Sequence, residues 1–308
     1  MNQTKYWIAL ERQQGIGPAH LIELHGILKD INVSLSDLFE ITADEIKAEF
    51  SLNSTTVKAI AAAAINIDQI ESDYLKVLDS GINVIPFFSQ DYPPRLTQIL
   101  GNTMPPFLYT IGRGSILSED SIAVLGDKNT SDKGLMIAYY GTKELTRHGI
   151  IVISGMAAGI GVTVHRSALE NRGTTAAVIP GGIFNLKIPE QLKDSLDPDR
   201  IVFVSPFYPS TEFNTFNGYI RNRIICALSK GVFIVEAPVK KGIFEAAKSA
   251  HKLKIPLFTA EYSDYPENAA GNPVILETME GIPVRGKMEN DLLIPNMDKI
   301  VAAARFSE

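Results

Sequence analysis

The chain has 308 residues, of which 45% are hydrophobic and 21% charged, and its formal net charge is −6. This is ordinary globular composition, long enough for about two domains. The single cysteine, Cys226, excludes a disulfide framework and a cysteine-rich metal site. No apolar run approaches the roughly 18 residues that span a bilayer, and the first residues lack the basic-then-apolar order of a secretion signal. We therefore expect a cytoplasmic protein without a membrane partner.

The charge is unevenly distributed along the chain. Residues 1–112 carry 7 basic and 13 acidic side chains, residues 113–260 carry 18 and 13, and residues 261–308 carry 4 and 9. A basic middle between two acidic flanks favours an anion-binding central domain. Chance scatter of charge is the simpler alternative.

Residues 1–80 are expected to form a small helical domain. Apolar-patterned pieces at 6–10 and 21–28 flank a GIGP turn that starts at Gly15. This is the layout of a helix-hairpin-helix, which can present backbone N–H groups to a nucleic-acid phosphate. Few basic residues surround the turn, so a plain connection within a helical bundle is favoured. Further helices are predicted at 35–38 and 42–50 and, as one long helix capped by Asn53 or Ser54, at 55–78.

Residues 81–112 are expected to connect this domain to the next one. Residues 83–86 form a short predicted strand, residues 89–100 a turn followed by a helix, and residues 104–112 an extended segment.

Residues 113–308 alternate short apolar runs with helical patterns. The runs at 121–125 and 152–154 are broken by Gly126 and Gly155, and residues 135–148 between them have helical spacing. Such alternation predicts an α/β fold, a Rossmann-like, mostly parallel sheet with helices on both faces. Further strands are predicted at 174–179, 201–205, 231–235 and 255–259, and helices at 213–228, 242–253 and 298–305.

The glycine turns follow the predicted strands and precede helices, where backbone N–H groups can hold an anion. The candidate phosphate-binding residues are Gly126, Lys128 and Ser131 at the first turn, Ser154, Gly155 and Gly159 at the second, and Gly181, Gly182 and Lys187 at the third. The simpler alternative is that these are solvated turns with tight helix–strand packing.

Arg221 and Arg223 flank Asn222 near a predicted helix start, where two guanidinium forks suit phosphate oxygens. They could instead form ion pairs with acids such as Glu236. His165 is expected to be a buried structural histidine rather than a catalytic one. Aromatic residues in the neighbouring loops could stack bases: Phe184, Phe207, Tyr208, Phe213, Phe216 and Tyr219.

Several segments occur in a fixed order between about residues 85 and 259. They are YPPRL, PPFLYTIG, VLGDK, ISGMAAGI, HRSAL, RGTTAAVIPGG and RNRIICALSKGVFIVEA. This series resembles the DprA/Smf family of DNA-processing proteins. The resemblance implies a Rossmann-like domain that binds single-stranded DNA without sequence preference and performs no known chemistry. It also implies a homodimer that loads a RecA-type recombinase during the natural transformation of competent cells. Some members carry a C-terminal winged-helix domain, for which this chain ends too soon.

The chain departs from the family pattern at its turns. The usual Gly-Ser-Arg is replaced by GDK at residues 126–128, which places an acid beside the turn and a lysine where the family has an arginine fork. Ala-Arg-Gly-Ile-Asp is replaced by AAGIG at 157–161, Ser-Gly-x-Leu-x-Thr-Ala by KGIFEAA at 241–247, and the Tyr-Pro after Lys187 by Ile188-Pro189. Despite these changes we expect the DNA role and no cofactor.

An enzymatic alternative rests on Glu245. The spacing Gly242-x-x-Glu245 is similar to the end of the Pro-Gly-Gly-x-Gly-Thr-x-x-Glu motif of LOG-type nucleotide phosphoribohydrolases, in which Arg223 would be the partner. A carboxylate there could stabilise an oxocarbenium-like ribose during N-glycosidic cleavage. The simpler explanation is a glutamate favoured by the helix dipole. A nucleotide-binding sensor or hydrolase, and a scaffold without a ligand, therefore stay open.

Overall fold

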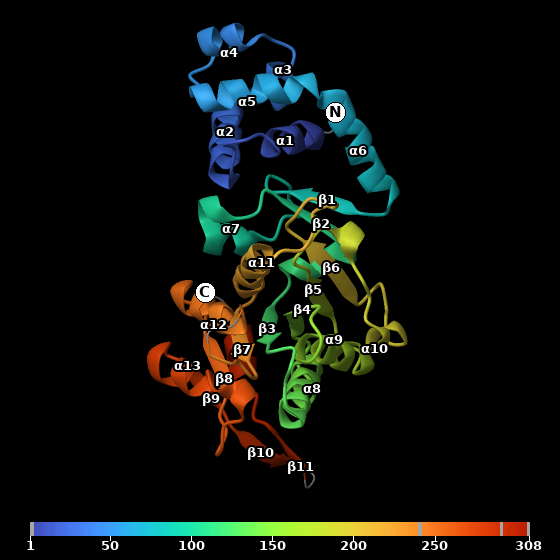
Figure 1. The fold of residues 1–308 in the computed structure, drawn as a ribbon, viewed down its shortest axis with the longest axis vertical. Coiled ribbons are helices and arrows are strands. Elements are labelled where there is room, and N and C mark those ends of the chain that lie inside the picture. Colours follow the sequence, from blue (N-terminus) through green and yellow to red (C-terminus); the bar gives the residue numbers. More distant parts are fainter. Residues whose placement is uncertain (1–2, 240–241, 290–291, 307–308) are drawn as a thin grey trace. The chain divides into compact units, whose positions relative to one another are not determined.

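The computed structural model describes residues 3–239, 242–289 and 292–306 (Figure 1). The chain divides into two compact units, one of Met1–Tyr92 with Leu100–Leu108 and one of Pro93–Ile99 with Tyr109–Glu308. The segment 81–112 is thus shared between both units. Among the described residues, no helix combines the length and the apolar character needed to cross a bilayer.

The amino-terminal part of the first unit consists of helices, as predicted. Its helices are α1 (Thr4–Glu11), α2 (Pro18–Asp30), α3 (Leu35–Leu38), α4 (Ala43–Glu49), α5 (Ser54–Ile65) and α6 (Ile67–Asp79). The prediction of one helix over 55–78 was wrong, because Asn66 leaves helical geometry at φ −113° and ψ 15° and separates α5 from α6. The expected cap by Asn53 is confirmed, since its side chain accepts a hydrogen bond from the Thr56 N–H.

The GIGP turn connects α1 to α2. Gly15 has a φ of +84°, a left-handed conformation that glycine adopts without strain. The N–H of Ile16 donates to the carbonyl of Gln13, and the N–H of Gly17 to Nδ1 of His20. Both N–H groups are therefore used inside the unit, as expected for a plain helix connection.

The sheet has the strand order β1-β2-β6-β5-β4-β3-β7-β8-β9. Its strands are β1 (Asn83–Pro86), β2 (Phe107–Gly112), β3 (Ser121–Leu125), β4 (Ile151–Gly155), β5 (Thr175–Val178), β6 (Ile201–Ser205), β7 (Gly231–Ile234), β8 (Leu257–Ala260) and β9 (Ile282–Val284). The strands from β3 to β9 pair in parallel, and β2 runs antiparallel to β6. The predicted Rossmann-like, mostly parallel sheet is confirmed.

The tail contains structure that the sequence did not predict. The strand β9 and the antiparallel hairpin of β10 (Gly286–Glu289) and β11 (Leu292–Pro295) lie between the last predicted strand, 255–259, and the last predicted helix, 298–305. β10 alternates exposed and half-buried residues and lacks an apolar run, whereas β9 and β11 are apolar runs of three and four residues that contain proline, which weakens a strand prediction.

Helices cover both faces of the sheet. They are α7 (Pro94–Leu100), α8 (Asp132–Arg147), α9 (Ile160–Glu170), α10 (Glu190–Lys193), α11 (Thr215–Leu228), α12 (Gly242–Lys252), α13 (Asn272–Thr278) and α14 (Asp298–Arg305). Short 3-10 turns lie at Gly101–Thr103, Gly114–Ser118, Ile183–Asn185 and Glu267–Ala269. The long crossover helix α8 and the last helix α14 agree with the predicted segments.

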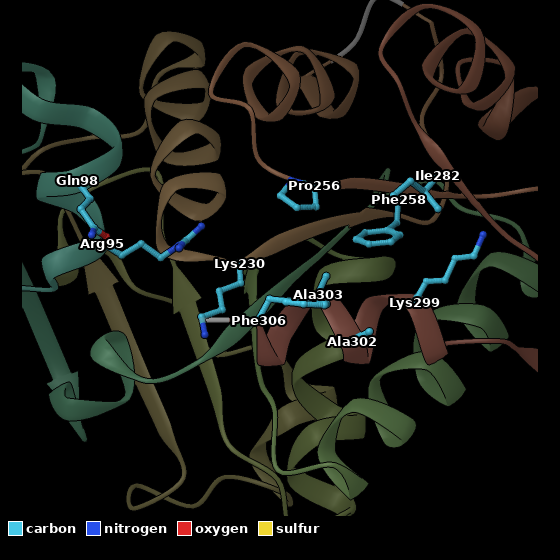
Figure 2. A pocket seen from close by; sticks show the side chains of 10 residues that line it. All are labelled: Arg95, Gln98, Lys230, Pro256, Phe258, Ile282, Lys299, Ala302, Ala303 and Phe306. Atoms are coloured by element: carbon cyan, nitrogen blue, oxygen red, sulfur yellow. The ribbon is translucent and has the colours of Figure 1, made fainter. Parts of the chain in front are cut away.

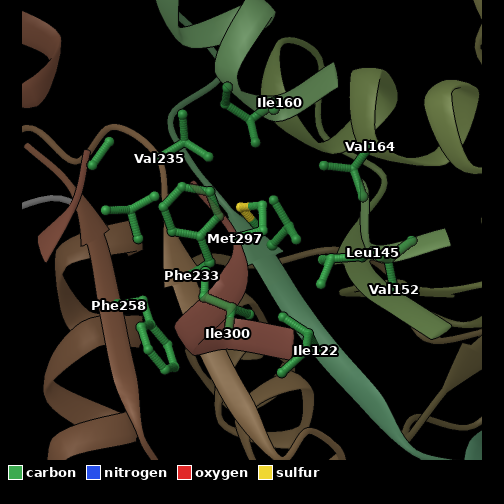
Figure 3. Packing of buried hydrophobic residues seen from close by; sticks show 14 of the residues in the cluster. Ile122, Leu145, Val152, Ile160, Val164, Phe233, Val235, Phe258, Met297 and Ile300 are labelled. Atoms are coloured by element: carbon green, nitrogen blue, oxygen red, sulfur yellow. The ribbon is translucent and has the colours of Figure 1, made fainter. Parts of the chain in front are cut away.

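One hydrophobic core lies between the sheet and three helices, as Figure 3 shows. Ile122, Val152, Phe233 and Phe258 from the strands meet Leu145 of α8, Ile160 and Val164 of α9, and Met297 and Ile300 around the start of α14. Each buried aliphatic or aromatic side chain stabilises the fold by roughly 1.5–3 kcal/mol. Parallel pairing of β3 with β4 and of β4 with β5 makes the carboxyl ends of these three strands neighbours along one edge.

Candidate nucleic-acid interface

The three predicted glycine turns lie side by side at the carboxyl ends of β3, β4 and β5. These strands are parallel neighbours, so their following turns meet at the same edge of the sheet. We call residues 126–131, 155–159 and 180–187 together the glycine-turn edge. Ligands of doubly wound α/β folds bind outside the carboxyl ends of the strands, which makes this edge the first place to look for a site.

At the first turn the protein supplies its own anion. The side chain of Glu236, which follows β7, is fully buried. Its carboxylate accepts hydrogen bonds from the hydroxyl of Thr130 at 2.6 Å, the N–H of Ser131 at 2.8 Å, the hydroxyl of Ser131 and the hydroxyl of Tyr262 at 2.9 Å. The amino end of α8, where a phosphate was expected, is therefore occupied by an internal carboxylate.

The position of Glu236 coincides with the reversal of strand order. From β3 the order continues through β4, β5 and β6 on one side and through β7, β8 and β9 on the other, and Rossmann-type ligands sit in the crevice at such a point. Here the Asp127 N–H donates to the Glu236 carbonyl at 3.0 Å, and the Val235 N–H donates to the Leu125 carbonyl at 2.8 Å. The chain thus fills this crevice itself.

The other first-turn candidates divide into packed and exposed residues. The Ser131 hydroxyl caps α8 by accepting the N–H of Gly134 at 3.0 Å. A Cβ on Gly126 would lie 2.4 Å from Cγ1 of Ile160, so this glycine permits close packing of α9. Lys128 is exposed, and its side chain is open to a ligand.

At the second turn the small residues let neighbouring groups approach. Gly159 has a φ of +72°, and a Cβ there would lie 2.5 Å from the carbonyl oxygen of Lys128. Ser154 is buried, and its hydroxyl donates to the Val124 carbonyl at 2.7 Å. A Cβ on Gly155 would lie 1.5 Å from Nη1 of Arg221, so the guanidinium packs directly against this glycine.

Arg221, Asn222 and Arg223 lie within α11 rather than at its start. The Arg221 Nη1 donates to the Val178 carbonyl at 3.4 Å, while its Nε is buried without a partner among the described residues. Burial lowers the pKa of Arg221 to about 10. The amide nitrogen of Asn222 donates to the Gly242 carbonyl at 3.0 Å, and Arg223 is partly buried. Glu236, which the sequence suggested as an ion-pair partner of Arg221 and Arg223, is instead hydrogen-bonded to Thr130, Ser131 and Tyr262.

The third turn combines a packed start with an exposed cation. The Gly182 N–H donates to the Thr211 carbonyl at 2.7 Å, and a Cβ on Gly182 would lie 2.2 Å from the Pro209 carbonyl oxygen. Next to Gly181 and Gly182 lies a cavity of about 150 Å³ lined also by Met156, Lys187 and Phe213. Lys187 is exposed.

The structure sorts the aromatic residues that the sequence could not sort. Four are exposed: Phe184 by 51%, Phe213 by 66%, Phe216 by 69% and Tyr219 by 43%. Phe207 and Tyr208 are partly buried, and the Tyr208 ring packs edge-on against Tyr109 at 5.9 Å. Four aromatic surfaces are thus open to a ligand beside the third turn and on α11.

The residues considered for chemistry have structural partners. The Glu245 carboxylate, in the first turn of α12, forms an ion pair with Lys248 at 2.7 Å. Lys241, which begins the KGIFEAA segment, lies outside the described residues. His165 is fully buried, and its Nδ1 lies 2.8 Å from the Thr175 hydroxyl. Among the described residues, no group of three or more histidine, cysteine or acidic side chains is placed to hold a metal ion.

The sequence model of the family described as DNA recombination-mediator protein A matches residues 83–281. The chain belongs to this family. The match includes the glycine-turn edge and α11. The chain is also 32% identical over 235 residues to the DNA processing protein DprA of Bacillus subtilis, an alignment that covers 73% of this chain and 77% of that protein.

Two solved structures of DNA processing protein A share the fold. The one from Streptococcus pneumoniae superposes with a TM-score of 0.71 at 22% identity, covering 92% of this chain and 95% of that one. The one from Helicobacter pylori, which is described by its single-stranded DNA binding mode, superposes with a TM-score of 0.59 at 19% identity. That match covers 72% of this chain and 94% of the Helicobacter pylori chain. At these identities the two structures show that the DprA fold is present in this chain.

Proposed function

We propose that this recombination-mediator family member binds single-stranded DNA without sequence preference along the glycine-turn edge. The observation that carries the proposal is the cavity beside the third turn. It brings the exposed cation Lys187 and the exposed ring of Phe213 together over the backbone of Gly181 and Gly182. Lys187 would pair with one phosphate there, and the ring of Phe213 would stack on the neighbouring base.

Phosphates are held by side chains in this proposal and not by the first turn. Glu236 already accepts the hydrogen bonds of Thr130 and Ser131, and its negative charge opposes a second anion at that point. The Asp127 carboxylate is buried and accepts the Asn129 N–H at 2.8 Å, so it is directed into the turn. Lys128 and Lys187, both exposed, provide the charge that a DNA backbone meets.

Bases are held by stacking. Phe184, Phe213, Phe216 and Tyr219 expose their rings, and every base offers a π-face, so stacking tolerates any sequence at about 1–3 kcal/mol per base. Exposed rings of this size are costly in water, and a bound strand would cover them.

The family supports the wider function. The Helicobacter pylori relative is described by its single-stranded DNA binding mode, and it has the same fold. By the same family resemblance we propose a cytoplasmic homodimer that loads a RecA-type recombinase during natural transformation. The hydrolase alternative receives no comparable support, because the Glu245 carboxylate is engaged by Lys248 at the surface.

The test is fluorescence anisotropy of a labelled poly-dT oligonucleotide with the wild type, Lys187→Ala and Phe213→Ala, from low to high salt. We expect salt-sensitive binding that weakens by about fivefold or more in each variant. Lys252→Ala is the matched control: Lys252 ends α12, and that helix begins at the carboxyl edge of the sheet, so its last residue lies at the other end. No binding by the wild type at low salt would refute the proposal.

A further inference from the structure

A second cavity lies at the opposite edge of the sheet. It has a volume of about 650 Å³, and its lining includes Arg95, Lys230, Pro256, Ile282, Lys299 and Phe306 (Figure 2). Lys230 and Pro256 directly precede β7 and β8, and Ile282 is the first residue of β9. Because these strands are parallel, the cavity sits at their amino ends, away from the glycine-turn edge.

The floor and one wall of this cavity are apolar. Pro256, Phe258 and Ile282 come from the strand ends, and α14 contributes Ala302 and Ala303 (Figure 2). Phe306, just after α14, is exposed by 73% at the rim. A flat apolar group such as an aromatic ring would find contact surface on both sides.

Basic side chains surround the apolar floor. Figure 2 shows Arg95 and Lys230 on one side and Lys299 on the other. The Arg95 Nε donates to the Ser229 carbonyl at 3.1 Å, and Lys230 pairs with Asp120 at 2.6 Å, so both are held in place. None of the described residues that line the cavity is acidic, although Asp120 lies next to it through its ion pair with Lys230, and no ion pair joins Lys299 to an acid in the described part of the chain.

The size and charge together restrict the ligand. Small-molecule sites are usually about 300–1,000 Å³ and mostly apolar, with a few placed polar groups. Three cations line the cavity and one acid, Asp120, pairs with a lining residue, so the balance of charge favours an anion, and a guanidinium fork suits phosphate oxygens. We propose that this cavity binds a free nucleoside phosphate, with its base on the apolar floor and its phosphates toward the cations at the rim, Lys299 among them. The site is separate from the proposed DNA-binding edge and does not depend on it.

The test uses the full chain and the fluorescent probe N-methylanthraniloyl-ADP, followed by anisotropy at low salt. We expect saturable binding that unlabelled ADP displaces and adenosine does not. Ala302→Trp, at an exposed position of α14, fills the cavity and should abolish binding. Lys299→Glu should weaken it about fivefold. Lys58→Glu, on the exposed side of α5, is the charge-matched control and should bind like the wild type.

Several results would overturn the inference. They are absence of saturable probe binding by the wild type, unchanged affinity in Ala302→Trp with the fold intact by thermal melting, and equal displacement by adenosine. Displacement by a dT oligonucleotide but not by ADP would also overturn it, because the probe would then report the DNA site. Retention of poly-dT binding by Ala302→Trp is expected if the two sites are separate.

Discussion

The carboxylate of Glu236 accepts a hydrogen bond from the backbone N–H of Ser131 at 2.8 Å, within the first turn of the glycine-turn edge. Two hydroxyls of the same turn and that of Tyr262 complete its partners. A buried charge with this many donors stabilises the fold only while the donors remain, since an unpaired buried charge is costly.

Removing this carboxylate should destabilise the second unit strongly. Glu236→Ala leaves the donors of Thr130, Ser131 and Tyr262 without their acceptor, and we expect a loss of about 3 kcal/mol or more in the free energy of unfolding. Tyr262→Phe removes one hydrogen bond and should cost about 1–2 kcal/mol. Urea denaturation measures both. If Glu236→Ala unfolded no more readily than Tyr262→Phe, the carboxylate would not be the centre of this network.

The DNA proposal makes a prediction about salt. Each phosphate neutralised on a single strand contributes about 0.7 to the slope of log affinity against log salt. Lys128→Ala and Lys187→Ala should each lower the slope by about 0.7, and together by about 1.4. Ser131→Ala should leave the slope unchanged, because the N–H and hydroxyl of Ser131 bond to Glu236. A slope reduced by Ser131→Ala would instead place a phosphate at the first turn.

Gly155 and Arg221 should be energetically coupled. A methyl group at Gly155 would lie 1.5 Å from Nη1 of Arg221 and would displace the guanidinium. If Arg221 contacts DNA from this position, Gly155→Ala and Arg221→Ala should weaken poly-dT binding to a similar extent, and the double variant should be no worse than either. Additive losses in the double-mutant cycle would show that the two residues act separately.

His165 should make stability depend on pH. Burial, with a smaller effect of the Arg221 charge in the same direction, lowers its pKa from 6.5 to about 4, and the Gly155 backbone opposes this. Between those two values the unfolded chain binds a proton that the folded chain does not. The free energy of unfolding should therefore fall as the pH drops from about 6.5 to about 4, by roughly 3 kcal/mol at most. Urea denaturation across this range should show a shallower fall in His165→Gln, and equal slopes would contradict the assignment.

The fold was predictable because its parallel strands are mostly short apolar runs that glycine, proline or polar residues end. β3, β6 and α14 lie within one residue of their predicted bounds, since Gly126 and the turn residues after Ser205 stop the apolar pattern. The break at Asn66 was not predictable, because the apolar pattern continues across it into α6.

The candidate site was predictable in its location and not in its chemistry. Spacing along the chain places the turns at one edge, but it does not show which N–H groups are already used. The hydrogen bond from Ser131 to Glu236 joins residues 105 positions apart. Only the sequence Val-Glu-Ala at the end of β7 hinted at it, as an acid directly after a buried strand.

The filled crevice at the reversal of strand order has a topological consequence. A crevice receives a small molecule or the terminus of a longer one. In this proposal the glycine-turn edge is instead a surface that is open at both ends. A strand can lie across such a surface at any interior position without being threaded. We therefore expect circular single-stranded DNA, which has no termini, to compete for this protein as well as linear DNA of equal length and composition.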